Sequence, residues 1–216
     1  MKTLSAYLLK FDRTLFLLFL ILLLAISFRA GRCLTVSYMD KDSVLYLSMA
    51  NTLVEDGIDS AFERNPRIPP MYIFAMAACK KYMGLTMETA GRLVSTVAGT
   101  FLILAVFLMA KLVFKNNNYA LIAAFLTATH PFLIVMSEDI MRDSLFICMI
   151  SFSLVFAMYG AERKNYVFWI ISGFFCAMAT MTRSEGIGIL FIVPLWFIIE
   201  FIFHRKDFSS SKSFIF

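Results

Sequence analysis

Long apolar runs, each nearly free of charged side chains, recur along this chain and limit what it can fold into. A helix that crosses a bilayer needs roughly 20 apolar residues. Charged residues make up only 16% of the chain, against about 25% in soluble domains. The sequence therefore predicts an all-α polytopic membrane protein, one domain over residues 1–216, with about six transmembrane helices. We expect the spans at 14–28, 93–112, 119–136, 145–159, 167–181 and 187–203.

The N-terminus resembles a secretory signal peptide but lacks its cleavage site. Lys2, Lys10 and Arg13 precede the apolar run 14–28, as they would in a signal peptide. Arg32 stands directly before the first cysteine, where lipoprotein cleavage requires a small residue, and no A-x-A site follows. We therefore expect the first span to be an uncleaved anchor helix.

A long polar segment, 29–90, separates the first span from the remaining spans at 91–203, and it contains two weaker helices. The first, 42–56, has apolar residues at helical spacing, and Gly57 follows it as a stop signal. The second, 71–83, is too short and too charged to cross a bilayer. We expect both to be surface helices of one outward loop.

The short loops indicate the orientation, because lysine and arginine concentrate on the cytoplasmic side of membrane proteins. Alternate segments carry the basic residues Lys2, Lys10, Arg13, Lys111, Lys115, Arg163, Lys164, Arg205, Lys206 and Lys212. Both termini are therefore expected in the cytoplasm, with 204–216 as a tail, and the protein in the plasma (inner) membrane. Cys33 and Cys79 would share the outward loop, and the sequence leaves a disulfide between them undecided.

Asp40, Asp42 and Tyr46 are the first group of residues suited to chemistry, just after the first span. A carboxylate at the membrane rim can accept a proton from an attacking hydroxyl, which is general-base catalysis. Asp42 and Tyr46 lie four residues apart and so share one helical face. Capping of the following helix by Asp42 or Ser43 is the structural alternative.

A second group occupies the turn between the third and fourth spans, where Glu138, Asp139, Arg142 and Asp143 crowd together. Charges at a membrane boundary are costly unless they are solvated, paired or functional. Arg142 suits a phosphate, whose oxygens its guanidinium matches. Glu138 and Asp139 suit a divalent cation, which prefers hard oxygen ligands. A turn that merely neutralises itself is the alternative.

Arg183 and Glu185 form a third group, at the end of the fifth span. Arg183 either extends to the lipid headgroups as an interface anchor or binds the anionic head of a lipid. Nucleic-acid binding is not expected, because no basic face with interleaved aromatic residues lies outside the apolar runs.

In their order and spacing, these motifs resemble the GT-C superfamily of membrane glycosyltransferases, especially its RgtA/B/C/D-like and protein-mannosyltransferase-like branch. The matching pieces are Asp42-Ser43-x-x-Tyr46-x-x-x-Ala50, Gly57, Arg67-x-x-Pro70-x-Tyr72, Gly84, Gly91-Arg92-Leu93-Val94-Ser95, Pro131, Arg142-Asp143-Ser144-Leu145 and Thr182-Arg183-x-Glu185-Gly186. The resemblance covers about residues 10–200, which corresponds to the N-terminal conserved part of the family. Ser43 departs from the many members that carry a second acidic residue there, and Asp40 is its nearby substitute.

The resemblance implies transfer of a sugar from a polyprenyl-phosphate carrier to a glycan, lipid or protein acceptor on the outer face. It implies that Asp42 is the catalytic acid/base, and that Arg142 and Arg183 hold the carrier phosphate. Asp40, Tyr46 and Glu185 are the further substrate-binding candidates, and a divalent cation is a candidate cofactor.

Two other functions remain open from the sequence. One is a non-catalytic membrane protein that keeps the GT-C-like fold, either as a remnant or as a partner subunit. The other is a small transporter, which would carry charged residues deep within its spans. The predicted span interiors contain almost none.

Overall fold

The computed structural model describes residues 13–35 and 39–188, together with Phe191 and Leu195. These residues form helices and no strand, which confirms the predicted all-α class. The helices are α2 (Arg13–Thr35), α3 (Lys41–Glu55), α4 (Ile58–Glu63), α5 (Met71–Met83), α6 (Met87–Phe114), α7 (Asn117–Thr129), α8 (Pro131–Glu138), α9 (Arg142–Arg163) and α10 (Tyr166–Thr180), followed by the 3-10 turn η1 (Ser184–Gly186).

Helices α2, α6 and α9 are long and apolar enough to cross a membrane. The pair α7 and α8 makes a fourth crossing if the two count as one bent span. Helix α10 is apolar but has 15 residues, which is shorter than a full crossing. The sixth predicted span, 187–203, falls almost entirely outside the described residues. The polytopic membrane architecture is confirmed.

The first span is longer than the sequence predicts, because two arginines inside it find partners in distant helices. The prediction ends the span at Phe28, whereas α2 continues to Thr35. Arg29 is fully buried and donates from Nη1 to the Ala128 carbonyl at 3.5 Å. Arg32 pairs with Glu138. A charge in a helix interior is tolerated once it is paired or hydrogen-bonded, which holds fully for Arg32 and in part for Arg29, whose buried Nε and Nη2 have no acceptor among the described residues. The helix continues through both arginines, so the outward loop begins later than residue 29.

The third predicted span is not one straight helix, because α7 and α8 meet at a bend of 55°. His130 separates them with extended backbone, φ −65° and ψ 117°. Pro131, the first residue of α8, has no N–H to continue the ladder of α7. The broken ladder frees carbonyls near the end of α7, and Arg29 contacts one of them, that of Ala128.

Small residues bring the spanning helices close together. Ala120, Ala124 and Ala128 of α7 are fully buried at spacings of four residues. At Gly160 an added Cβ would lie 2.8 Å from the Trp169 ring, so α9 and α10 touch through a glycine. Such small-residue contacts are the usual means by which membrane helices associate.

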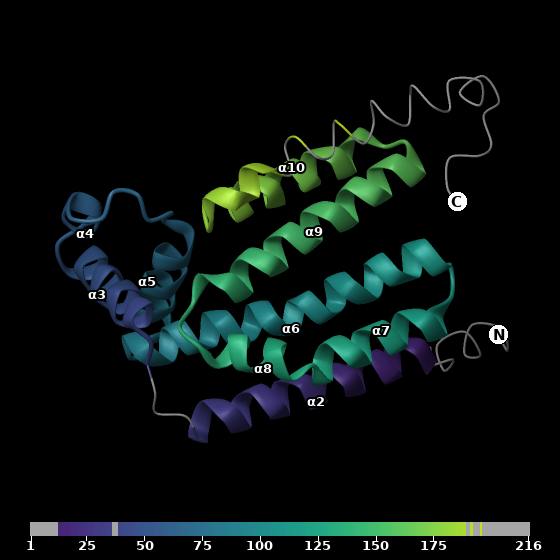
Figure 1. Ribbon diagram of the computed structural model, residues 1–216, viewed down its shortest axis with the longest axis horizontal. Coiled ribbons are helices and arrows are strands. Elements are labelled where there is room, and N and C mark those ends of the chain that lie inside the picture. Colours follow the sequence, from purple (N-terminus) through teal and green to yellow (C-terminus); the bar gives the residue numbers. More distant parts are fainter. Residues whose placement is uncertain (1–12, 36–38, 189–190, 192–194, 196–216) are drawn as a thin grey trace, which may run out of the picture.

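Helices α3, α4 and α5 form a cap over one end of the bundle (Figure 1). The sequence predicts α3 and α5 closely, and Gly84 ends α5 in the left-handed region with φ +68°. It misses α4, which lies in the charged segment after Gly57. Tyr46, Met49, Tyr72, Ile73 and Met76 form the buried centre of the cap, and Ile140 and Leu145 join it from the bundle.

The connections of the bundle sort to two ends (Figure 1). The start of α2 lies at the same end as the α6–α7 and α9–α10 connections, which carry Lys115 and Lys164. The opposite end holds the cap, the α8–α9 turn and the end of α10. All three predicted groups of functional residues therefore lie at the capped end.

Candidate functional site

The first acidic group lies at the start of α3, and there Asp40 is the helix cap. Asp40 has extended backbone, and its side chain accepts a hydrogen bond from the Lys41 N–H at 2.7 Å. Ser43 is buried. Asp42 is exposed in the first helical turn, and no hydrogen bond or ion pair joins its side chain to another described residue. Capping therefore does not account for Asp42.

Tyr46 connects α3 with the bundle. Its side chain is 3% exposed. The Tyr72 ring meets it edge-on with centroids 5.9 Å apart, and the Arg142 guanidinium lies 5.9 Å from its centroid. Burial raises the pKa of Tyr46, Arg142 opposes that shift, and Asp42 adds to it. Tyr46 is thus the point at which the first and second predicted groups meet.

Arg142 is a half-buried cation at the first residue of α9. Its guanidinium makes a cation–π contact with the Tyr46 ring. No carboxylate among the described residues lies within ion-pair distance of Arg142. A guanidinium that stacks on a ring by one face keeps its N–H donors for a ligand. Arg142 is therefore available to bind an anion.

Arg183 differs from Arg142, because carboxylates of this chain already occupy it. It forms an ion pair with Asp143, and its Nη2 lies 3.0 Å from Glu185 Oε1. The hydrogen bond from Arg183 lowers the pKa of Glu185. The Nε–H of Arg183 is buried and has no acceptor among the described residues. Arg183 thus joins the end of α10 to the start of α9.

Asp139 lies between α8 and α9, next to the buried Glu138. Burial raises the pKa of Asp139, and the charges of Glu138 and Asp40 add to that shift, while Arg92 and Arg32 oppose it. Asp40 and Asp139 are therefore close enough for their charges to influence each other. We call residues 39–42 the first acidic loop and residues 139–141 the second.

The predicted cation ligands Glu138 and Asp139 have different surroundings. Both oxygens of Glu138 accept hydrogen bonds from Arg32, which competes with metal coordination. Within residues 13–35 and 39–188, no group of three or more His, Cys, Asp or Glu side chains is arranged to hold a metal ion. The metal site stays a prediction.

An apolar groove of about 770 Å³ runs along α6, α9 and α10 beside the cap. On α9, Leu145, Met149, Phe152 and Phe156 line it, and they recur at helical spacing from Arg142. Its other lining residues are Cys79, Met83, Leu93, Val94, Val97, Ala98, Phe101, Leu104, Cys148 and Phe175. Cys79 and Cys33 are both free thiols, and Cys33 lies in α2 rather than in the outward loop.

Sequence reasoning misses two parts of this site, the groove and Arg32. The groove is formed where three helices pack together, and a hydropathy pattern describes one segment at a time, so it cannot show the groove. Arg32 draws attention only as a residue that argues against cleavage. Its spacing of three from Arg29 is a usable signal, since it places two cations on one face of a continued helix.

Comparison with known proteins identifies the family. The model of the dolichyl-phosphate-mannose-protein mannosyltransferase family matches residues 67–215. The match includes Arg142, Asp143, Arg183 and Glu185, whereas Asp40, Asp42 and Tyr46 precede it. No curated protein and no solved structure matches the chain. The matched segment is more than half of the chain and confirms the GT-C resemblance, so the chain belongs to the dolichyl-phosphate-mannose-protein mannosyltransferase family of membrane glycosyltransferases.

Proposed function

We propose that this protein transfers a sugar from a polyprenyl-phosphate carrier to an acceptor at the outer face of the membrane. The observation that carries the proposal is the position of Arg142. It is a cation without a carboxylate partner among the described residues, about one helical turn before Leu145, which lines the apolar groove. A polyprenyl-phosphate sugar has the matching parts, a long apolar chain and an anionic phosphate.

The groove suits the isoprenoid chain of the carrier. Its lining is apolar, and Phe152, Phe156 and Phe175 stack with centroids 5.3 to 6.3 Å apart. Because the carrier chain already lies in lipid, van der Waals packing rather than transfer out of water would favour it in the groove. With the chain along α9, the phosphate would come to the first turn of that helix, where Arg142 donates to it. The helix N-terminus also favours negative charge.

In the proposed reaction, Asp42 acts as the general base. It accepts the proton of the acceptor hydroxyl as that oxygen attacks the anomeric carbon of the sugar. The bond from the anomeric carbon to the phosphate oxygen breaks, and polyprenyl phosphate leaves with both bonding electrons. Arg142 stabilises the charge that develops on the phosphate. The displacement inverts the configuration at the anomeric carbon.

The remaining predicted residues have supporting roles in this proposal. Asp40 fixes the start of α3, and Tyr46 holds the guanidinium of Arg142 beside it. Arg183 pairs with both Asp143 and Glu185 and so holds the end of α10 beside Arg142 at the start of α9. We take the orientation that the short-loop charges predict, with the cap outside and both termini in the cytoplasm, in which a glycan, lipid or protein acceptor would arrive from the outer aqueous phase.

The test is a transfer assay with the full chain in lipid nanodiscs. A panel of radiolabelled polyprenyl-phosphate sugars, including the mannose donor for which the family is named, is incubated with glycan, lipid and protein acceptors. The proposal predicts labelled acceptor for at least one donor, and loss of that signal in Arg142→Ala. Lys164→Ala, which changes an exposed cation at the opposite end, is the matched control. Equal transfer by Arg142→Ala and the parent would contradict the proposal.

A further inference from the structure

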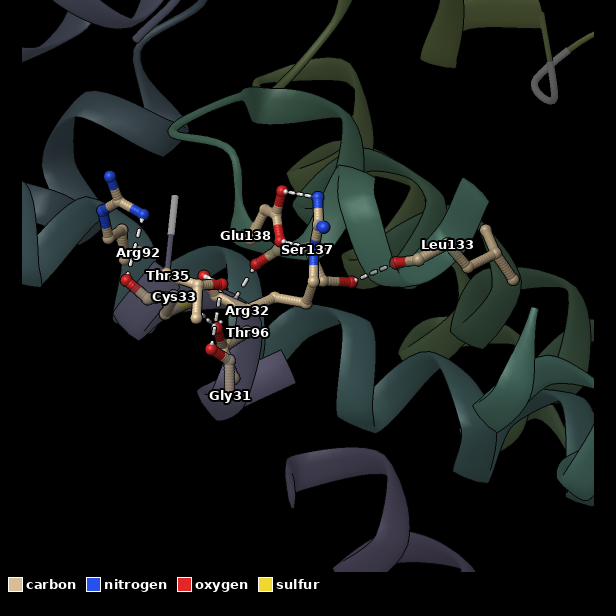
Figure 2. A network of polar contacts seen from close by, with 9 residues as sticks. All are labelled: Gly31, Arg32, Cys33, Thr35, Arg92, Thr96, Leu133, Ser137 and Glu138. Carbon is tan, nitrogen blue, oxygen red and sulfur yellow. Dashed lines mark hydrogen bonds and ion pairs between the residues drawn. The ribbon is translucent and has the colours of Figure 1, made fainter. Parts of the chain in front are cut away.

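Arg32 and Glu138 form a two-pronged ion pair at the capped end of the bundle (Figure 2). Arg32 Nε lies 2.7 Å from one Glu138 carboxylate oxygen, and Nη2 lies 2.8 Å from the other. This parallel arrangement is the strongest geometry that arginine and a carboxylate adopt. It joins α2 to the last residue of α8, which is 106 residues away in the sequence.

The two partners are buried to very different extents. The Glu138 side chain is 3% exposed, whereas that of Arg32 is 47% exposed. A buried carboxylate without a partner is strongly unfavourable, while a solvated arginine is not. Arg32 is therefore the group that allows Glu138 to remain charged in this position.

The end of α8 is also fixed from the side of α6. Thr96 Oγ1 donates to the Ser137 carbonyl at 3.3 Å, and Ser95 Oγ donates to the Met141 carbonyl at 3.3 Å (Figure 2 shows the first). At Gly99, an added Cβ would clash with Ser137. These contacts thus fix the end of α8 against α6, and the ion pair fixes it against α2.

The pair stands at the base of both acidic loops. Asp40 directly precedes α3, and Asp139 directly follows Glu138. Arg142 comes three residues after Asp139, at the start of α9. The charges of Arg32 and Asp40 both act on Asp139, so the ion pair lies close to both acidic loops, and a shift between α2 and α8 would change how the two loops face each other.

We propose that Arg32 and Glu138 are positioning residues, which hold the first acidic loop and the α8–α9 turn in register for sugar transfer. The inference rests on the proposed function for its catalytic part only. The relative position of the two loops is a property of the fold, and hydrogen exchange measures it independently of sugar transfer.

The test compares Arg32→Gln, Glu138→Gln and the double variant in nanodiscs. Transfer and backbone amide hydrogen exchange over 39–42 and 139–141 are both measured. Arg32→Gln leaves a buried carboxylate unpaired, so it is expected to lower transfer by about 10²-fold, the effect of a displacement near 1 Å, and to raise exchange in both loops. Glu138→Gln leaves an unpaired but solvated arginine, so it is expected to lower transfer less than Arg32→Gln does. Added to Arg32→Gln, it removes the unpaired charge and restores part of both signals.

Lys115→Gln is the matched control, because it breaks the ion pair with Glu162 between α6 and α9 at the opposite end of the bundle. It is expected to leave transfer and both loops unchanged. Additive effects of the two single variants, or exchange that stays at the parent level in both loops, would overturn the inference. Equal damage from Lys115→Gln would also overturn it, as would exchange that rises in only one loop. If the parent transfers no sugar, the proposed function fails, and the exchange data alone decide the inference.

Discussion

Gly99 provides the sharpest test of how closely α8 packs on α6. An alanine there would place its Cβ 2.8 Å from Ser137 Cβ and 3.2 Å from Arg29 Nε, with the Ser137 hydroxyl nearer still. Ser137 and Arg29 are both buried, so neither side chain has free space to turn into. Overpacking of this kind typically costs about 1–3 kcal/mol.

The expected effect of Gly99→Ala is a fall in Tm of about 2–12 °C, from about 2–4 °C per kcal/mol for a chain of this size. A thiol-reactive dye reports the transition in detergent once the half-buried Cys33 and Cys79 are replaced by serine, because Cys148 and Cys176 are buried and react only on unfolding. Ser137→Gly in the Gly99→Ala background removes the clashing atoms and is expected to raise Tm again.

Gly173→Ala is the control, since nothing lies within 4 Å of its added Cβ. There, alanine avoids the conformational cost of a glycine in a helix, which increases the free energy of unfolding by at most about 1 kcal/mol. The Tm is therefore expected to stay level or rise. A Gly99→Ala protein with the Tm of the parent would refute the close α6–α8 contact. A larger loss in Gly173→Ala than in Gly99→Ala would do the same.

Three further predictions follow from the site and the topology. Arg142→Ala is expected to weaken binding of polyprenyl phosphate by roughly 1–3 kcal/mol, with lysine recovering only part; unchanged affinity in an equilibrium binding assay would contradict this. Burial raises the pKa of Asp139, so the ionised carboxylate destabilises the folded protein at pH 7. Asp139→Asn should therefore raise Tm at pH 7. The gain should vanish as the pH falls toward about 4, because Asp139 is then protonated in the folded and unfolded states alike. In a background without native cysteines, a cysteine at Ser60 should react with an impermeant thiol reagent in intact cells and one at Asn117 should not; reversed labelling would contradict the orientation.

Local signals in the sequence predict the cap well. Pro70 precedes α5 and Gly84 ends it, and the predicted bounds, 71–83, are those of the structure. Helix α3 begins one residue earlier than predicted, because Asp40 rather than Asp42 caps it. These boundaries depend on residues within a few positions of the helix end, so a single chain segment contains the information.

The parts that the sequence does not predict depend on distant partners. Helix α2 continues past Phe28 because Arg29 and Arg32 meet Ala128 and Glu138 about 100 residues later. The ion pair between Arg183 and Asp143 likewise forms only because α9 packs against α10, which the sequence does not show. Hydropathy cannot distinguish a charge that ends a span from one that a neighbouring helix neutralises.

The site was predicted as a set of residue types and not as a geometry. Asp42, Tyr46 and Arg142 were expected to share the substrate site, and the structure brings Tyr46 and Arg142 together. The difference between Arg142, which is open to a ligand, and Arg183, which is paired, required the side-chain contacts. Both arginines look alike in the sequence, since each lies at the boundary of a span with an acidic residue, Asp143 or Glu185, one or two positions later.

The most direct test of the central claim is sugar transfer by Asp42→Asn, measured beside the parent with the same radiolabelled polyprenyl-phosphate donor. Asparagine keeps the size of the side chain but cannot accept the proton, and Asp40 remains to cap α3. The account predicts that transfer falls by roughly 10²–10⁴-fold while Tm and carrier binding stay at parent values. Asp59→Asn, an exposed acidic residue on α4, should transfer like the parent. Transfer by Asp42→Asn at the parent rate would contradict the account.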